Sequence, residues 1–213
     1  MITHLRPALS LVILFTLLLG LVFPLGFVGL GNVAFHSAAN GSLIERNGHP
    51  VGSALIGQNF TTDRYFHMRE SAISGTDPKD ATKTVATPYD ASTSSASNLG
   101  PTSKALHDRV AADVAILEKQ GAVAGSIPMD AVTSSGSGLD PDISPEFAAL
   151  QAPVVAKARH LPVDAVRELL ASGTEGRLFG LIGEPRVNVL RLNLALDSLP
   201  VSHDTKGTET SSR

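Results

Sequence analysis

The stretch ALSLVILFTLLLGLVFPLGFVGL, residues 8–30, decides the fold of this chain. It contains no charged residue, and leucine, valine, isoleucine and phenylalanine dominate it. Roughly 20 apolar residues at ~1.5 Å each are enough to span a hydrocarbon layer of ~30 Å as a helix. A backbone inside lipid must satisfy its own hydrogen bonds, which a helix does. The sequence therefore predicts a single membrane helix over residues 8–30.

A cleaved secretory signal is the alternative interpretation of the amino-terminal region. Arg6 supplies a short basic start, and Ser37-Ala38-Ala39 resembles a small-residue cleavage site. The apolar part of such a signal is normally only ~7–15 residues long, so the length of this run favours an uncut anchor. Arg6 precedes the run, and the next basic residue is Arg46. This asymmetry predicts that residues 1–7 form a cytoplasmic tail and that the chain continues outside the membrane.

Composition excludes several classes of function. The 17 basic and 20 acidic residues give a net charge of −3, which leaves no basic surplus for nucleic acid. The chain has no cysteine, which excludes disulfides, cysteine-ligated metal sites and thiol catalysis. The seven histidines are scattered singly, so they predict no metal site. No phosphate-binding loop, dinucleotide fingerprint or Gly-x-Ser-x-Gly elbow occurs, so the motifs of a self-sufficient ATPase or hydrolase are missing.

Strands are predicted near both ends of the part that follows the anchor. Asn47-Gly48 lies between two extended segments and tolerates the positive φ angles of a type I′ turn, which predicts a hairpin over 43–56. Residues 186–194 begin with β-branched character and partly alternate, which predicts a half-buried strand that pairs near this hairpin. The polar composition of 73–97 predicts a long surface loop. Residues 199–213 are predicted to be a disordered tail.

Three helices are predicted between these strands. The second begins with Ser144 as N-cap and Pro145 in the first turn, and the third opens at Pro162 and ends near Gly173. With strands at both ends, they predict one mixed α+β domain over 31–198. The first helix is predicted from four apolar residues at helical spacing that should pack into the core: Leu106, Val110, Val114 and Leu117.

The most unusual soluble segment is 134–144, which is rich in serine and glycine. Its backbone groups would suit an ion or a partner, or it is a plain loop leading to the cap at Ser144. Asp140 and Asp142 have the same two interpretations, because carboxylates two residues apart occur both in cation sites and in inert turns. Gln151 lies on the predicted buried face of the second helix. Its amide must therefore find partners, either in a structural hydrogen bond or in a functional contact.

Several short segments form a specific set when they are taken in chain order: GSLI (41–44), VGSALIGQNF (51–60), SNLGP (97–101), SGSGLDP (135–141) and GEPRVNVL (183–190). With the apolar helix before them, these segments resemble the KdpC family, the C subunits of Kdp-type potassium-transporting ATPases. The chain departs from the family pattern at Glu70, Ala96 and Asp142, and residues 74–87 resemble an insertion. The resemblance implies a single-pass subunit of the bacterial inner membrane, with its amino terminus inside and its main domain periplasmic.

The resemblance also implies partners and a role. The partners would be a P-type ATPase subunit, a channel-like subunit that binds potassium, and a small membrane peptide subunit, all within the lipid bilayer. This chain would be a non-catalytic accessory subunit without a firmly bound cofactor, while the complex transports potassium. One role is assembly of the pump, with gating at the outer mouth of the channel-like subunit. The other is a catalytic chaperone that raises the ATP affinity of the P-type subunit. Because ATP is cytoplasmic, the predicted topology favours assembly.

The resemblance implies two sets of site residues and no catalytic or metal-ligating residue. The nucleotide-contact candidates, which belong to the chaperone role, are Ser135, Gly136, Ser137, Gly138 and Gln151. The candidates for partner contact or structure are Asn98, Gly100, Pro101, Asp140, Arg186 and Asn188. Two further classes remain as alternatives. A periplasmic solute-binding lipoprotein lacks its lipobox cysteine here, and a membrane-tethered hydrolase lacks its nucleophile motif.

Overall fold

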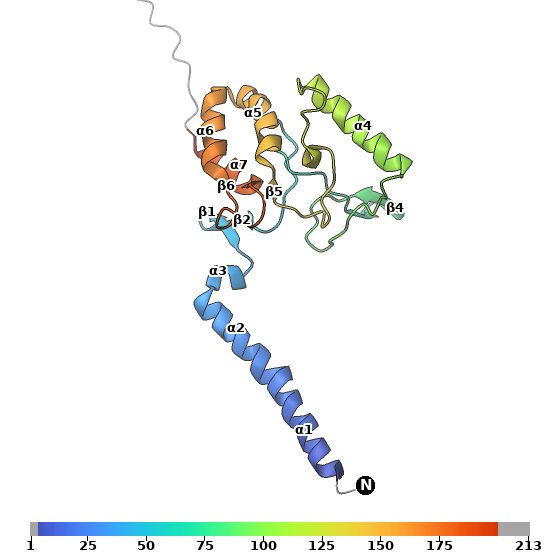
Figure 1. Ribbon diagram of the computed structural model, residues 1–213, viewed down its shortest axis with the longest axis vertical. Coiled ribbons are helices and arrows are strands. Elements are labelled where there is room, and N and C mark those ends of the chain that lie inside the picture. Colours follow the sequence, from blue (N-terminus) through green and yellow to red (C-terminus); the bar gives the residue numbers. More distant parts are fainter. Residues whose placement is uncertain (1–3, 200–213) are drawn as a thin grey trace, which may run out of the picture. The chain divides into compact units, whose positions relative to one another are not determined.

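The computed structural model describes residues 4–199 and divides after Ser53 into two units, drawn in Figure 1. The first unit holds a long apolar helix and a hairpin, and the second holds helices and short strands. This confirms the predicted α+β class with one amino-terminal apolar helix.

The amino-terminal helix runs through α1 (Leu5–Leu17), the π-helical turn η2 (Leu18–Val22) and α2 (Phe23–Ala34) without a break. It is 30 residues long, and its most apolar 18-residue window has a mean hydropathy of 2.7. It is the one described helix that is long and apolar enough to cross a membrane. The π-helical turn ends two residues before Pro24, which has no N–H to donate to the turn before it. The helix contains the whole predicted span 8–30.

The short helix α3 (His36–Ala39) leads from the long helix to a hairpin of β1 (Leu43–Arg46) and β2 (His49–Ser53), which pair antiparallel. Asn47 and Gly48 at its turn have φ angles of 54° and 76°. Positive values at both central residues are those of a type I′ turn, which confirms the predicted hairpin.

In the second unit, the segment 73–97 contains a hairpin, so the prediction of a loop without strands was wrong there. Strands β3 (Ser74–Asp77) and β4 (Asp80–Ala86) pair antiparallel, with Thr76 opposite Thr84. Most of their side chains are exposed or half-buried, so burial contributes little to this hairpin. Because neither face of the hairpin is buried, its strands show no alternation of apolar and polar residues. Cross-strand threonine pairing stabilises it instead.

Helix α4 (Lys104–Lys119) forms where it was predicted, but its apolar face does not pack into the core. None of its residues is buried, and the four residues of the predicted stripe are half-buried at most. Figure 1 shows α4 as a rod that stands apart from α5, α6 and α7. The prediction of core packing was wrong because Asp113, on the same face, lines a cavity rather than a packed layer.

Helices α5 (Pro145–Arg159) and α6 (Val163–Gly173) begin as predicted. The Ser144 hydroxyl accepts a hydrogen bond from the Phe147 N–H at 3.0 Å, which is the expected N-cap. Pro162 stands at the N-cap position of α6. The two helices pack against each other and bury one face each.

A small antiparallel sheet joins the helices in the order β5-β7-β6, with β5 at Asp142–Ile143, β7 at Arg186–Asn188 and β6 at Thr174–Glu175. The predicted terminal strand 186–194 was therefore wrong beyond Asn188, because the chain continues as α7 (Val189–Ser198). The expected pairing near the amino-terminal hairpin was also wrong, since β7 pairs with β5 and β6.

The reason for the early end of the strand is local. The Asn188 side chain accepts a hydrogen bond from the Arg191 N–H at 3.1 Å and so starts α7 as its N-cap. The buried residues Val189, Leu192 and Leu196 then recur at intervals of three and four, which is the period of a helix. The same region also alternates in part, so the sequence pattern alone favoured a strand.

The core of the second unit lies among α5, α6, α7 and the extended segment 66–73. Its largest fully buried apolar side chains are those of Phe66, Ile73, Val155, Val166, Val187, Val189 and Leu196. Of the predicted tail 199–213, all but Leu199 lies outside the described residues.

Candidate functional site

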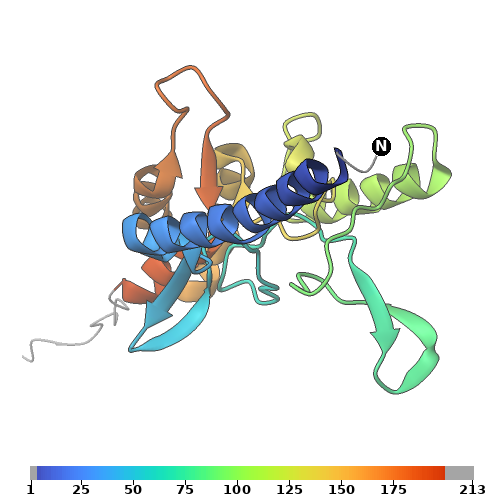
Figure 2. The same ribbon diagram turned by 90° about the horizontal axis from the view of Figure 1, so that it is seen from below.

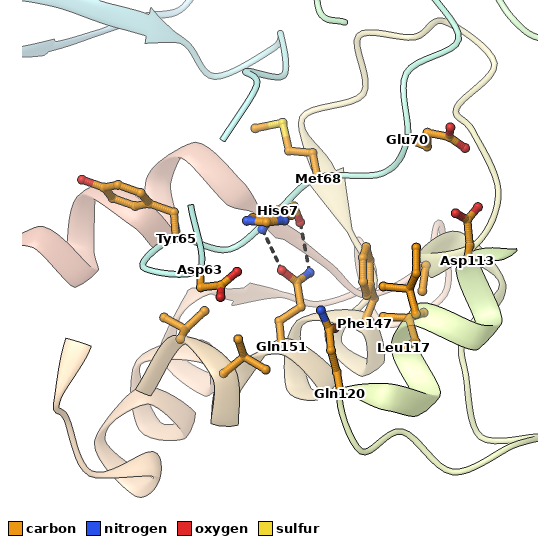
Figure 3. Close-up of a pocket in the computed structure, with 14 residues that line it drawn as sticks. Asp63, Tyr65, His67, Met68, Glu70, Asp113, Leu117, Gln120, Phe147 and Gln151 are labelled. Atoms are coloured by element: carbon orange, nitrogen blue, oxygen red, sulfur yellow. Dashed lines mark hydrogen bonds between the residues drawn. The ribbon is translucent and has the colours of Figure 1, made fainter. Parts of the chain in front are cut away.

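A cavity of about 330 Å³ lies between α4, α5 and the extended segment 63–70 (Figure 3). Its wall is partly apolar, with Leu117 of α4 and Phe147 of α5 on the two helices. Its polar lining consists of Asp63, Tyr65, His67, Glu70, Asp113, Gln120 and Gln151. The segment that forms one side of the cavity has no regular secondary structure, so side chains must hold it in place.

Gln151 of α5 fixes this segment at His67 (Figure 3). Its Oε1 accepts a hydrogen bond from the His67 N–H at 2.7 Å, and its Nε2 donates to the His67 carbonyl at 3.0 Å. The side-chain amide thus bonds both backbone groups of His67, as a neighbouring β-strand would. This contact supplies the partners that the position of Gln151 on a buried face requires.

Asn193 of α7 makes the same pair of bonds to the preceding residue, Phe66. Its Oδ1 accepts from the Phe66 N–H at 2.8 Å, and its Nδ2 donates to the Phe66 carbonyl at 3.0 Å. Both residues are almost fully buried. Successive residues of an extended chain present their backbone groups to opposite sides, so Asn193 and Gln151 hold the segment from two sides. We call these two contacts the amide clamps.

Arg159 of α5 holds the beginning of the same segment. Its Nε donates to the Arg64 carbonyl at 2.5 Å, and its guanidinium lies 4.7 Å from the centre of the Tyr65 ring. Its Nη2 pairs with Asp197 at 2.7 Å, although the arginine is only 9% exposed. A buried guanidinium requires such a full set of partners. The arginine therefore has a structural role.

Two carboxylates of the cavity have raised pKa values. Burial is the main cause at Glu70, where Asp113 adds to the effect and Arg109 opposes it. Burial also raises the pKa of Asp113, again against Arg109. The Nη1 of Arg109 lies 3.0 Å from the Glu70 carboxylate. One arginine thus partly compensates two carboxylates that are withdrawn from water.

The lining restricts what this cavity accepts. Asp63, Glu70 and Asp113 all contribute carboxylates, whereas the nearby Arg109 is already paired with Glu70. The described residues that line the cavity include no lysine or arginine, so a polyphosphate entering it would meet like charge. An apolar or cationic group would fit its mixture of apolar wall and acidic side chains better. Among residues 4–199, no set of three or more histidine or acidic side chains is placed to hold a metal ion.

The serine and glycine loop 135–138 uses many of its polar groups within the protein. The Ser135 hydroxyl accepts from the Gly138 N–H at 2.8 Å, and the Ser135 N–H donates to the Glu70 carbonyl at 3.1 Å. The Gly138 carbonyl accepts from the Ser71 hydroxyl at 2.7 Å, and the Ser137 carbonyl accepts from the Ser95 N–H at 3.0 Å. The loop therefore fastens two distant segments of the chain to each other.

The two glycines of this loop differ. Gly138 is buried with a φ of +71°, and a Cβ there would lie 2.5 Å from Cγ1 of Ile73. Gly136 is exposed, and a Cβ there would meet nothing within 4 Å. Among the described residues that line the cavity, Gln151 is present and loop 135–138 is not. The cavity thus does not bring the five nucleotide-contact candidates together.

A second depression, a charged groove of about 620 Å³, includes two of the partner candidates, Asp140 and Arg186. Asp140 accepts a hydrogen bond from Arg69 at 3.3 Å. Arg186 pairs with Asp142 at 3.2 Å and with Glu175 at 2.9 Å. Five carboxylates line the groove against two arginines: Asp130, Asp140, Asp142, Glu146 and Glu184 with Arg69 and Arg186.

Asn188 joins the groove to the rest of the unit. Its Nδ2 donates to the Asp142 carboxylate at 3.1 Å and to the Ala54 carbonyl at 3.0 Å. Burial raises the pKa of Asp142, and this outweighs the Asn188 hydrogen bond and the charge of Arg186, which lower it. Asn188 therefore caps α7 and positions Asp142 at the same time.

The remaining partner candidates lie elsewhere, before α4. Asn98 has a φ of +52°, and its amide donates to the Ala96 carbonyl at 3.2 Å. Gly100 and Pro101 are exposed, and the Gly100 carbonyl accepts from the Ser103 N–H at 2.9 Å. These three residues shape the approach to α4 and do not line the groove described above.

Sequence reasoning missed Asn193 and Arg159, which fix the cavity segment. Asn193 stands between Leu192 and Leu194 in the sequence, and a polar amide in an apolar run is the same signal that singled out Gln151. It went unused because the region was predicted to be a strand. Arg159 carried no signal, since basic residues are common in the last turn of a helix.

Comparison with known proteins gives one consistent result. The model of the family described as K+-transporting ATPase, c chain, matches residues 5–198. A relative from Methylobacterium nodulans is 58% identical over 199 residues, covering 93% of this chain and 98% of its own. Relatives from Bradyrhizobium diazoefficiens and Rhodopseudomonas palustris are 55% and 56% identical, and each match covers 98% of the relative. All three carry the name potassium-transporting ATPase KdpC subunit.

Proposed function

Because the chain belongs to the KdpC family, the c chains of K+-transporting ATPases, we propose that it assembles and stabilises a potassium pump without catalysing a reaction itself. Its accessory place in a multi-subunit potassium-transporting complex follows from the family, which also confirms the resemblance found in the sequence. The proposed partners are a P-type ATPase subunit, a channel-like potassium-binding subunit and a small membrane peptide subunit.

The observation that carries the proposal is the apolar helix Leu5–Ala34. The most apolar 18-residue window of this 30-residue helix has a mean hydropathy of 2.7, and none of the residues in that window is buried by the protein itself. Such a surface needs lipid or other membrane helices around it. A chain with this anchor is placed where it can join membrane subunits, and losing the anchor would remove it from the pump.

We further propose that the amino terminus lies in the cytoplasm and that residues 54–198 lie outside the inner membrane. Arg6 supports this orientation because basic residues flanking a membrane helix stay on the cytoplasmic side. On the outer side, the domain would stand beside the mouth of the channel-like subunit. The excess of carboxylates over arginines in the charged groove supports a role there, because such a surface attracts cations rather than anions.

The chaperone role for ATP has less physical support. Its candidate residues include Gln151, whose amide is bonded to the backbone of His67, and Gly138, which is buried against Ile73. The acidic lining beside Gln151 would repel a triphosphate. A domain outside the membrane would also be separated from cytoplasmic ATP. These points favour assembly and gating over nucleotide binding.

Removal of the anchor tests the proposal. We expect that deleting residues 8–30 abolishes copurification of the other pump subunits with the tagged chain and prevents growth at low potassium. The matched control replaces 8–30 with an unrelated apolar helix of the same length. This control separates general tethering from contacts of the native helix, because tethering alone would retain the domain at the membrane. A complete, active pump containing the deleted chain would contradict the proposal.

A further inference from the structure

The loop between β6 and β7 ends in an exposed apolar tip, made by residues 178–183. Figure 2 shows this loop projecting beyond the two strands. Leu178, Phe179, Leu181 and Ile182 are 59%, 86%, 82% and 63% exposed. The two other residues of the tip are glycines, so the sequence LFGLIG carries no polar side chain. Single exposed apolar residues are common, but a contiguous group of four is typical of a surface that meets another apolar medium.

The backbone of the apolar tip is bonded within the loop. The N–H of Leu178 donates to the Ile182 carbonyl at 2.9 Å, and the N–H of Ile182 donates to the Leu178 carbonyl at 3.0 Å. The N–H groups of Gly180 and Leu181 donate to the carbonyls of Arg177 and Leu178 at 3.0 and 3.1 Å. These four backbone N–H groups are therefore hydrogen-bonded within the loop and do not require water as a partner. Entry into an apolar medium would leave these bonds intact, which an open loop cannot achieve.

Paired charges surround the neck of the loop. Arg177 lies 2.5 Å from Glu184, and Arg186 lies 2.9 Å from Glu175 on the two strands. These pairs leave the neck close to neutral, so attraction to anionic lipid is not the driving force. Charged groups remain at the polar headgroup level of a membrane while apolar groups enter below it. The neck would thus limit insertion to the tip.

The linker between the two units limits how far the second unit can lie from a bilayer. Only the segment 35–53 separates the apolar helix from Ala54, the first residue of the second unit. Even fully extended, that segment could not exceed roughly 65 Å, and its hairpin makes it shorter. A protein partner is the less fitting occupant, because protein interfaces carry about one hydrogen bond per 100–200 Å² and this tip has no side chain to make one.

We propose that the apolar tip inserts into the interfacial layer of the bilayer that holds the amino-terminal helix, as a second lipid attachment of the chain. The attachment needs the membrane anchor but neither the other pump subunits nor a particular orientation, since each leaflet offers the same apolar layer. It would limit the freedom of the second unit relative to the membrane surface.

The chain has no tryptophan, so Phe179→Trp creates a single fluorescent probe at the tip. The full chain carrying this change would be reconstituted alone into phosphatidylcholine vesicles. We expect its emission to shift to shorter wavelength and to be quenched by lipids brominated on their acyl chains. Val123→Trp is the matched control, because Val123 is 70% exposed on another loop of the same unit. Its emission should stay that of a water-exposed indole and resist this quenching.

Further measurements distinguish whether the apolar tip contacts lipid or another protein. Adding Leu181→Asp to the Phe179→Trp variant should abolish the shift, whereas replacing part of the lipid with phosphatidylglycerol should leave it unchanged. The inference would be overturned if the indole of Phe179→Trp behaved like that of Val123→Trp, or if it became shielded only after the other pump subunits were added. A shift that required anionic lipid would also overturn it. All these outcomes are independent of whether the anchor deletion disrupts the pump.

Discussion

Helices α5 and α4 border the same cavity, yet they are held in different ways. Six residues of α5 are buried, and its Gln151 and Arg159 side chains fix the segment 64–67 through backbone hydrogen bonds. No residue of α4 is buried, and this helix contacts the end of the cavity segment through the ion pair of Arg109 with Glu70. The comparison indicates that the α5 and α7 side determines the stability of the unit, while the α4 side tolerates change.

The strongest test of this difference removes one of the amide clamps. Asn193→Leu keeps the branched shape and the number of heavy atoms of the side chain but leaves the N–H and carbonyl of Phe66 buried without partners. Each of these two unsatisfied buried groups costs about 1–3 kcal/mol, so we expect the free energy of unfolding to fall by roughly 2–6 kcal/mol. Urea unfolding of the full chain in detergent, followed by circular dichroism, measures this loss.

The matched variant on the other side is Ile116→Ala in α4, where the side chain is 54% exposed. We expect a change of only about 0.5 kcal/mol or less, as for other surface positions. If Ile116→Ala destabilised the chain as much as Asn193→Leu, the contrast between the two helices would be lost. Gln151→Leu should fall between them, because its half-buried position lets water reach part of the His67 backbone.

A second test concerns the loop 135–138, and it uses two neighbouring glycines. Gly138→Ala places a methyl group against Ile73 at a φ of +71°, so we expect a loss of roughly 1–3 kcal/mol from clash and strain. Gly136→Ala should be close to neutral, since nothing lies near its Cβ position. The same urea experiment compares them. Equal effects of the two changes would show that the loop is not packed as described.

The smallest expected effect is a pH dependence at the α4 side of the cavity. Burial raises the pKa of Glu70 from 4.5 and of Asp113 from 3.8, so the folded chain binds protons that the unfolded chain has already lost. The free energy of unfolding therefore falls as the pH rises from those ordinary values through the raised ones. Glu70→Gln together with Asp113→Asn should weaken this fall and increase stability at neutral pH.

Urea unfolding at a series of pH values measures that slope in the original chain and in the double variant. The slope should decrease without vanishing, because burial also raises the pKa of Asp142, which both chains keep. A slope that stayed the same, or a double variant less stable at neutral pH, would show that ionised Glu70 and Asp113 are well accommodated in the folded chain.

Local signals explain which elements could be predicted from the sequence. The turn at Asn47-Gly48 and the N-cap at Ser144 depend on neighbouring residues, and the structure confirms both. The hairpin β3–β4 depends on cross-strand pairing of polar residues, which leaves no hydrophobic pattern to read. In α7 the helical and strand periods coincide over a few leucines, and the capping by Asn188 decides between them.

The candidate site was predictable only in part. The polarity of Gln151 on a buried face predicted that it needs partners, but its partner His67 lies 84 residues away and no local rule identifies it. Phe66 and Asn193 are separated by 127 residues, so their contact depends on the whole fold. The apolar tip escaped notice because its glycines interrupt any regular period.

The most direct measurement labels single cysteines in spheroplasts that carry the whole pump. The chain has no cysteine, so Val123→Cys in the second unit and His4→Cys before the membrane helix each give one site. With a maleimide that cannot cross the membrane, we expect labelling of Val123→Cys in intact spheroplasts and of His4→Cys only after lysis. Labelling of His4→Cys with protection of Val123→Cys would place the domain in the cytoplasm and contradict an outward-facing assembly subunit.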